Sequence, residues 1–201
     1  MLSLDHLVVS ALTLADGVAV DHALGVPLQA GGEHLEMGTH NRLLGLGADY
    51  LEVIAIDPER RFIDHPRWFD LDCFTGSPRL TNWVCRTDNL AELAAYFPGA
   101  LELTEFARGP YRWRIALTLD GRLPYDGAFP AFIEWVQGHP APDLTERDCR
   151  LMRLDIAHPL ADELRDRIGP WLSDPRLHFL TAPEKSLRAV IATPSGEKVL
   201  T

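Results

Sequence analysis

The sequence has few cysteines and no long apolar run. Its three cysteines, Cys73, Cys85 and Cys149, are odd in number, far apart and without a C-x-x-C pair, which favours reduced thiols over a disulfide framework or a zinc site. No stretch approaches the roughly 20 apolar residues that cross a bilayer. A strand-like segment follows Met1 too closely for a cleavable signal peptide. We therefore expect a cytoplasmic protein without a membrane partner.

Clustered positive charge is also scarce. The 201 residues include 19 Lys and Arg against 29 Asp and Glu, a formal net charge of -10, and no basic run is longer than residues 60–61. Because binding to nucleic-acid phosphates needs a clustered basic surface, we expect no nucleic-acid partner. The chain also lacks the glycine and serine motifs of serine hydrolases, P-loop proteins and dinucleotide-binding folds.

What the sequence does contain is a recurring order of predicted elements. The first unit reads as a strand, a helix ending at Gly25 and three short strands, at 4–11, 13–24, 26–29, 41–46 and 50–56. The second unit repeats this order, with strands at 80–85, 100–103, 113–119 and 129–136. Its helix follows Asp88, a predicted N-cap, and carries Leu90, Leu93, Ala94 and Phe97 at helical spacing before Pro98.

A third, shorter unit begins near residue 151. Placing His6, Asn82 and Ile156 in register gives spacings of 76 and 74 residues, which supports repetition of one unit. We predict an α+β fold of paired β-α-β-β-β modules with a partial third β-α-β-β module, packed as one globular unit. The predicted modules are 1–58, 80–138 and 151–201, joined by linkers at 59–79 and 139–150.

Candidate chemistry lies on the predicted strands. Side chains alternate across a strand, so His6 shares a face with Leu4 while Asp5 lies on the opposite face. Glu52 falls in the middle of an apolar strand, which is costly unless its charge is paired or bound. His6 and Glu52 are therefore candidate metal ligands, although a satisfied core histidine and a partly exposed strand carboxylate are the plain alternatives.

The second unit offers Asn82 at the His6 position and Glu134 at the Glu52 position. Two carboxylates and an imidazole at corresponding points of two repeats can converge on a divalent ion. Glu134 is thus a candidate metal ligand and a candidate catalytic base, or alternatively a solvent-facing residue on an edge strand. Asn82 is a poor metal ligand, so substrate binding through hydrogen bonds is the role we expect for it.

Two polar segments supply further candidates. Residues 33–41 carry His34 and His40, whose spacing fits no zinc pattern, and a polar hairpin tip explains the segment better than direct catalysis. His40 is the catalytic candidate from this segment, and Asn41 is the substrate-binding one. Three arginines lie near two aromatic residues: Arg108, Arg112 and Arg114. They form either an anion-binding clamp or, more readily, a solvated strand face. Arg112 and Arg114 are our substrate-binding candidates.

Three stretches together resemble a known family. They are LDHLVV at 4–9, GTHNRLL at 38–44 and YLEVIAIDP at 50–58. The GTHN stretch followed by YLEV is the more specific part, and together these motifs look like the glyoxalase-like branch of the vicinal oxygen chelate superfamily. The resemblance implies sheets that curl around a central cup, where a divalent metal and a small-molecule substrate bind.

In that superfamily the metal ligands come from the first and last strands of two paired modules. By position, the resemblance implies His6, Glu52, Asn82 and Glu134 here, with zinc, nickel, manganese or iron as the ion. Asn82 departs from the usual histidine, which leaves three good ligands. The third module is a further difference, and it would cover the cup or support a homodimer.

Two functions from different classes follow. The first is a metal-dependent lyase, isomerase or dioxygenase, in which the ion chelates two vicinal oxygens of the substrate and stabilises an oxyanion. The second is a metal-free protein whose cup binds or sequesters a small molecule. Convergence of His6, Glu52 and Glu134 on one point is the feature that discriminates between them.

Overall fold

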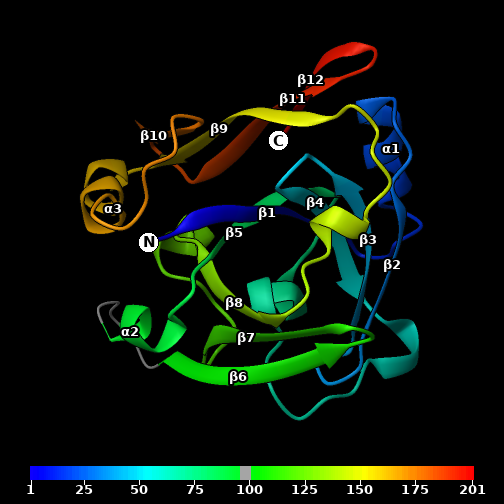
Figure 1. The fold of residues 1–201 in the computed structure, drawn as a ribbon, viewed down its shortest axis with the longest axis horizontal. Helices are drawn as coiled ribbons and strands as arrows, with labels where there is room; N and C mark the ends of the chain where they lie inside the picture. Colours follow the sequence, from blue (N-terminus) through cyan, green and yellow to red (C-terminus); the bar gives the residue numbers. More distant parts are fainter. Residues whose placement is uncertain (96–100) are drawn as a thin grey trace.

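A curved eight-stranded sheet dominates the computed structural model, which describes residues 1–95 and 101–201 (Figure 1). The strand order is β2-β3-β4-β1-β5-β8-β7-β6. The strands are β1 (Ser3–Ser10), β2 (Gln29–His34), β3 (Thr39–Gly45), β4 (Tyr50–Ile56), β5 (Arg79–Arg86), β6 (Leu101–Arg108), β7 (Tyr111–Thr118) and β8 (Ala131–Gln137). The predicted α+β class and the paired modules are confirmed.

The two modules are joined at the centre of this sheet. The first strands of the modules, β1 and β5, pair antiparallel, and each pairs in parallel with the last strand of its own module, β4 or β8. The modules are therefore related by an approximate two-fold rotation between β1 and β5. One face of the curved sheet forms a cup with its own hydrophobic core. The other face carries a second hydrophobic core, which we call the outer core.

Short helices connect the strands. They are α1 (Val18–Leu24), α2 (Leu90–Ala94) and α3 (Ala161–Ile168). Helix α1 ends at Gly25, whose φ of 68° is accessible to glycine without strain. Helix α2 is capped by Asn89 rather than the predicted Asp88, because the Asn89 side chain accepts a hydrogen bond from the Glu92 amide. Three sequence predictions, for Phe97 and Pro98 and for a strand start at residue 100, lie outside the described residues.

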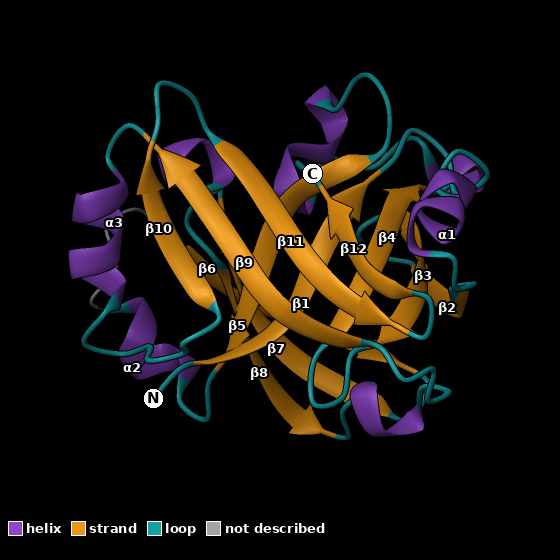
Figure 2. Ribbon diagram, turned by 90° about the horizontal axis from the view of Figure 1, so that it is seen from above, coloured by secondary structure: helices purple, strands orange, loops and turns teal. Residues whose placement is uncertain are grey.

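The C-terminal unit forms a separate sheet that crosses the large one (Figure 2). Its strands are β9 (Arg150–His158), β10 (Leu177–Thr181), β11 (Ser186–Thr193) and β12 (Gly196–Leu200), in the order β10-β9-β11-β12. Here the first strand pairs with the second and third strands, whereas in the other units it pairs with the last. The third unit is therefore not a copy of the repeat, because similar local patterns do not determine which strands pair.

The outer core joins the two sheets. Trp83 of β5 packs in one hydrophobic cluster with Leu154 and Ile156 of β9. The terminal residue also connects the sheets, since the backbone amide of Leu80 donates to the Thr201 carbonyl at 3.0 Å. In the part of the chain that is described, no helix is long and apolar enough to span a membrane.

Candidate functional site

A β-bulge in β1 shapes the polar end of the cup, which contains His6, Asn41 and Glu52. The β1–β5 register shifts between Leu4 and His6, so Asp5 is an extra residue without a direct partner. Leu4 consequently joins Leu7 in the outer core, while His6 lines the cup. Our expectation that His6 shares a face with Leu4 was wrong, because simple alternation fails at a bulge.

Asp5 orients His6. The fully buried Asp5 carboxylate accepts a hydrogen bond from His6 Nδ1 at 2.6 Å through Oδ1. Its Oδ2 accepts from Trp135 Nε1 and from His139 Nε2, both at 3.0 Å. Burial by itself would raise the pKa of Asp5, but the hydrogen bonds from His139 and His6 lower that pKa well below its usual range. The proton therefore lies on His6 Nδ1, and Nε2 is directed away from Asp5.

His6 Nε2 faces a second buried carboxylate. The distance from His6 Nε2 to Glu52 Oε2 is 3.6 Å, and the Tyr50 ring stacks on the imidazole at 4.5 Å between centroids. The other Glu52 oxygen accepts a hydrogen bond of 2.5 Å from Asn41 Nδ2. His6, Glu52 and Asn41, which the sequence singled out, thus lie together in one cavity.

A positive charge enters the same cavity from β6. Arg108 Nη1 donates to His34 Nε2 at 2.9 Å and to Asn41 Oδ1 at 3.3 Å. Burial and the Arg108 charge together lower the pKa of His34 to about 3, so His34 is neutral and its Nδ1 donates to the Thr39 hydroxyl. Within the described residues, Arg108 forms no ion pair with a carboxylate. Its charge is therefore available to an anionic ligand.

The remaining cavity wall is aromatic and aliphatic. The cavity has a volume of about 40 Å³ and is open to solvent on one side, so a small group of a ligand can enter it. Trp68 and Phe69 come from residues 59–79, which we predicted as an irregular linker. Two short 3-10 helices lie at the start of this segment and within it, Pro58–Arg60 and Trp68–Cys73. This segment therefore covers the cup besides connecting the modules. Its Trp68 indole Nε1 is buried without a hydrogen-bond partner among the described residues.

The second module does not repeat the polar end of the cup. His6 pairs with Val84 and Val8 pairs with Asn82 across β1 and β5, so the two-fold rotation relates His6 to Asn82, as predicted. The Asn82 amide, however, donates to the Gly127 carbonyl at 3.3 Å and lines a different cleft.

Glu134 does not correspond to Glu52. Glu52 pairs with Val8, and the residue that pairs with the equivalent Val84 is Ala131, three positions before Glu134. The Glu134 carboxylate lies on the other face of β8, where it accepts hydrogen bonds from the Leu90 amide and from Arg114 at 3.0 and 2.6 Å. The structure therefore does not bring Glu134 to His6, because an apolar strand offers no local mark of its pairing register.

Three other predicted residues lie away from the cavity. Arg112 is exposed and bonds to the backbone carbonyls of Gly109 and Tyr111. Arg114 pairs with Glu134 outside the cup. His40 alternates with Asn41 on β3 and does not line the cavity, although its Nε2 is buried without a hydrogen-bond partner in the described part of the chain.

These residues do not fit a resident divalent metal ion. Of the four two-fold-related positions, only two carry strong donors, His6 and Glu52, while the others carry Asn82 and Ala131. The Arg108 charge in the same cavity also opposes a cation. Across the described ranges, no three His, Cys, Asp or Glu side chains are grouped to hold an ion.

Some functional residues were missed by sequence reasoning. Asp5 was assigned to the opposite face, His139 was not among the candidates, and Trp68 was assigned to a linker. Arg108 was considered in the arginine clamp, but Arg112 and Arg114 were chosen in its place. The LDH motif at 4–6 was the available signal for Asp5, because an acidic residue beside a histidine is a usual orienting partner.

Comparisons with known proteins agree with this architecture. A family model described as a glyoxalase-like domain matches residues 4–172. No curated protein matches the chain. A hypothetical protein from Staphylococcus aureus has a similar structure, with a TM-score of 0.64 and 11% identity over 92% of this chain and 88% of that one.

Two weaker structural likenesses add no argument. Methylmalonyl-CoA epimerase from Mycobacterium tuberculosis has a TM-score of 0.44 and 17% identity over 66% of this chain and 85% of its own. A hypothetical protein from Bacillus halodurans has a TM-score of 0.46 and 13% identity, over 67% and 93% of the two chains.

Proposed function

Because the chain belongs to the glyoxalase-like domain family of the vicinal oxygen chelate superfamily, we propose that its cup binds a small molecule with an anionic or carbonyl oxygen and transfers a proton on it without a resident metal. The observation that carries this proposal is the Asp5–His6 hydrogen bond of 2.6 Å, with His6 Nε2 beside Glu52 in the wall of the cavity. A buried carboxylate behind an imidazole fixes its tautomer and stabilises its charged form.

The proton transfer starts at a carbon next to a carbonyl group. His6 Nε2 accepts the proton, the electron pair of the broken C–H bond moves onto the carbonyl oxygen, and the Arg108 guanidinium stabilises the enolate oxygen. The carboxylates of Asp5 and Glu52 stabilise the resulting imidazolium. Return of the proton to the same carbon gives exchange, and its delivery to a neighbouring atom completes an isomerisation, with no oxidant or reductant required.

The apolar wall supports binding of the rest of the molecule. Trp113 and Trp135 lie against each other at 5.6 Å between centroids, so an aliphatic or aromatic substituent can be desolvated there. The unpartnered Trp68 Nε1 is an additional donor for a ligand oxygen. This wall also favours the second candidate function, in which the cup only binds or sequesters its ligand.

A proton-exchange experiment tests the proposal. Small 2-oxo acids and hydroxyketones are incubated with protein and a metal chelator in deuterated water, and NMR follows exchange of the proton next to the carbonyl. We expect exchange with the wild-type protein and a loss of about 100-fold or more in the His6→Gln variant, the usual size of a general-base contribution. Binding that NMR detects without exchange assigns the second candidate.

Metal content is measured on the same samples. Zinc, nickel, manganese and iron, the ions that the family resemblance implies, are quantified by elemental analysis before and after incubation with each ion. The metal-free proposal is contradicted if the wild-type protein holds one equivalent of metal, the His6→Gln variant loses this metal, and proton exchange depends on it.

A further inference from the structure

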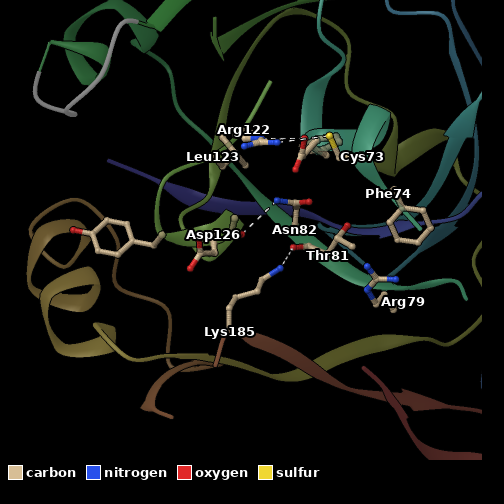
Figure 3. A pocket seen from close by; sticks show the side chains of 13 residues that line it. Cys73, Phe74, Arg79, Thr81, Asn82, Arg122, Leu123, Asp126 and Lys185 are labelled. Carbon is tan, nitrogen blue, oxygen red and sulfur yellow. Dashed lines mark hydrogen bonds and ion pairs between the residues drawn. The ribbon is translucent and has the colours of Figure 1, made fainter. Parts of the chain in front are cut away.

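A wide polar cleft lies beside the cup, around Asn82. It has a volume of about 580 Å³ and is lined by β5, by the 3-10 helix Tyr125–Gly127, by the segment 69–74 and by Lys185 just before β11 (Figure 3). Phe69 lines both this cleft and the cup, so its side chain stands between the two. The Phe69 backbone has a φ of 61°, an uncommon conformation for a bulky residue that accompanies functional sites.

The cleft is the two-fold counterpart of the polar end of the cup. The β1–β5 register shifts a second time between Asn82 and Leu80, which makes Thr81 an extra residue like Asp5 in β1. Thr81 and Asn82 thus occupy the positions of Asp5 and His6. The carboxylate and imidazole of the first module are replaced by uncharged groups.

Two cations of this cleft, Lys185 and Arg79, lie outside ion-pair distance of any described carboxylate. Lys185 Nζ donates to the Thr81 carbonyl at 2.6 Å, and Arg79 Nη1 donates to the Thr75 carbonyl at 2.7 Å. Neither side chain forms an ion pair with a carboxylate of the described residues. Lys185 is half-buried, and the Asp126 charge offsets only part of the cost of burying its charge, so an anion beside it would be stabilising.

The other charged groups of the cleft have hydrogen-bond partners. Arg122 forms an ion pair with Asp70 at 3.3 Å, and Asp126 Oδ2 accepts a hydrogen bond from His158 Nε2 at 3.4 Å. The ammonium group of Lys185 has three donors, of which one is used by Thr81. Lys185 and Arg79 are therefore the groups of the cleft with spare charge and spare donors.

We propose that this cleft binds the oxyanion group, phosphate or carboxylate, of a small molecule between Lys185 and Arg79. The anion takes the free donors of Lys185 and offsets two positive charges that otherwise repel each other. The Asn82 side chain, whose Nδ2 donates to the Gly127 carbonyl, lines the same cleft and contributes a polar surface (Figure 3). This site is separate from His6 and Glu52 in the cup. The two proposals therefore succeed or fail independently.

The binding should depend on pH. Burial and then the Arg79 charge lower the pKa of Lys185 to about 8, while the charge of Asp126, which faces Lys185 from the 3-10 helix, acts in the opposite direction. An anion prefers protonated Lys185, so binding should weaken as the pH rises through this pKa. For the same reason the bound anion should raise the Lys185 pKa.

The chain contains only two lysines, Lys185 and Lys198, which makes a direct NMR test simple. Protein with 13C-labelled lysine is titrated with inorganic phosphate and, separately, with succinate, and the two Cε signals are followed at several pH values. We expect the Lys185 signal to shift at saturation and its pKa to rise, with Lys198 unchanged. Tighter binding of phosphate or of succinate identifies which of the two oxyanions the site prefers.

Variants provide the matched control. Lys185→Met and Arg79→Gln should each weaken binding of the preferred anion about tenfold or more, by loss of a charge-assisted hydrogen bond, while Lys198→Met should have no effect. Calorimetry measures the affinity, and circular dichroism confirms that each variant is folded. A Lys185 signal that does not respond to either anion overturns the proposal. An equal response of both lysines, or one reproduced by sodium chloride at the same ionic strength, overturns it as well.

Discussion

At the scale of single residues, the buried Asp5 carboxylate organises the cup. It accepts three hydrogen bonds, from His6, Trp135 and His139, and thereby connects β1, β8 and the segment after β8. Because these donors lower its pKa, Asp5 is charged at neutral pH, and the charge both stabilises the fold and fixes the His6 tautomer.

We predict that Asp5→Asn destabilises the protein in a pH-dependent way. The amide cannot accept all three hydrogen bonds, so the free energy of unfolding at pH 7 should fall by about 1–3 kcal/mol. A carboxyl group whose pKa is lowered on folding adds stability above its unfolded pKa of about 3.9, and this stability is lost as the pH falls below that value. Urea unfolding between pH 3 and pH 7 checks this. A difference between the two proteins that is the same at every pH contradicts the prediction.

Arg108 provides a second test at this scale. We predict that Arg108→Gln weakens ligand binding in the cup about tenfold or more, because it removes the cavity's unpaired positive charge. The variant should also raise the pKa of His34, which the Arg108 charge helps to lower, although burial keeps that pKa below normal. NMR titration of His34 measures the shift. The exposed Arg112→Gln is the control and should change neither quantity.

At the scale of elements, the segment between the modules is part of the site. Arg67 is 4% exposed, and its guanidinium donates to the carbonyls of Arg60 and Arg61 at 2.9 and 3.0 Å. These bonds hold the segment across the cup, where Trp68 and Phe69 complete the wall. The sequence had suggested only a linker here, because sequence patterns do not show where a loop returns to the core.

We predict that Arg67→Met loosens this segment. Loss of bonds from a buried charged donor to backbone carbonyls should lower the free energy of unfolding by about 1.5–3 kcal/mol. Hydrogen–deuterium exchange should increase in residues 58–73 and remain unchanged in β9 to β12. Arg61→Met is the control, because Arg61 contributes only its backbone carbonyl. Uniform acceleration of exchange throughout the protein indicates global destabilisation and contradicts the prediction.

At the scale of the whole molecule, the third unit stabilises the outer face of the large sheet. Besides the shared hydrophobic core, Arg176 forms an ion pair with the buried Asp49, and this links the unit to the first module. The predicted homodimer stays a prediction, which light scattering in solution checks. The boundaries of the predicted modules and linkers also remain predictions.

We predict that the third unit cannot be removed. A chain ending at residue 148 would expose the outer-core surface around the fully buried Trp83, and we expect it to aggregate or to lose cooperative unfolding. The full chain should unfold in one transition, which calorimetry tests. A truncated chain that unfolds cooperatively and retains its near-ultraviolet circular dichroism contradicts this prediction.

The sequence by itself determined the α+β class and the pairing of two modules, and it singled out His6, Asn41 and Glu52, which the structure brings into one cavity. Each of these follows from local information, namely strand and helix periodicity, glycine turns and an unusual carboxylate in an apolar strand. The resemblance of three motifs to a known family added the cup, and the family model confirms the membership.

Only the tertiary structure decided the remaining composition of the site. The bulge at Asp5, the register that places Ala131 rather than Glu134 opposite Val84, and the entry of Arg108 from the far edge of the sheet all depend on which strands pair and in which register. A shift of one residue moves every side chain of a strand to the other face. Strand pairing is a long-range property, so the local pattern fixed the elements while their packing selected the charged groups that meet in the cup.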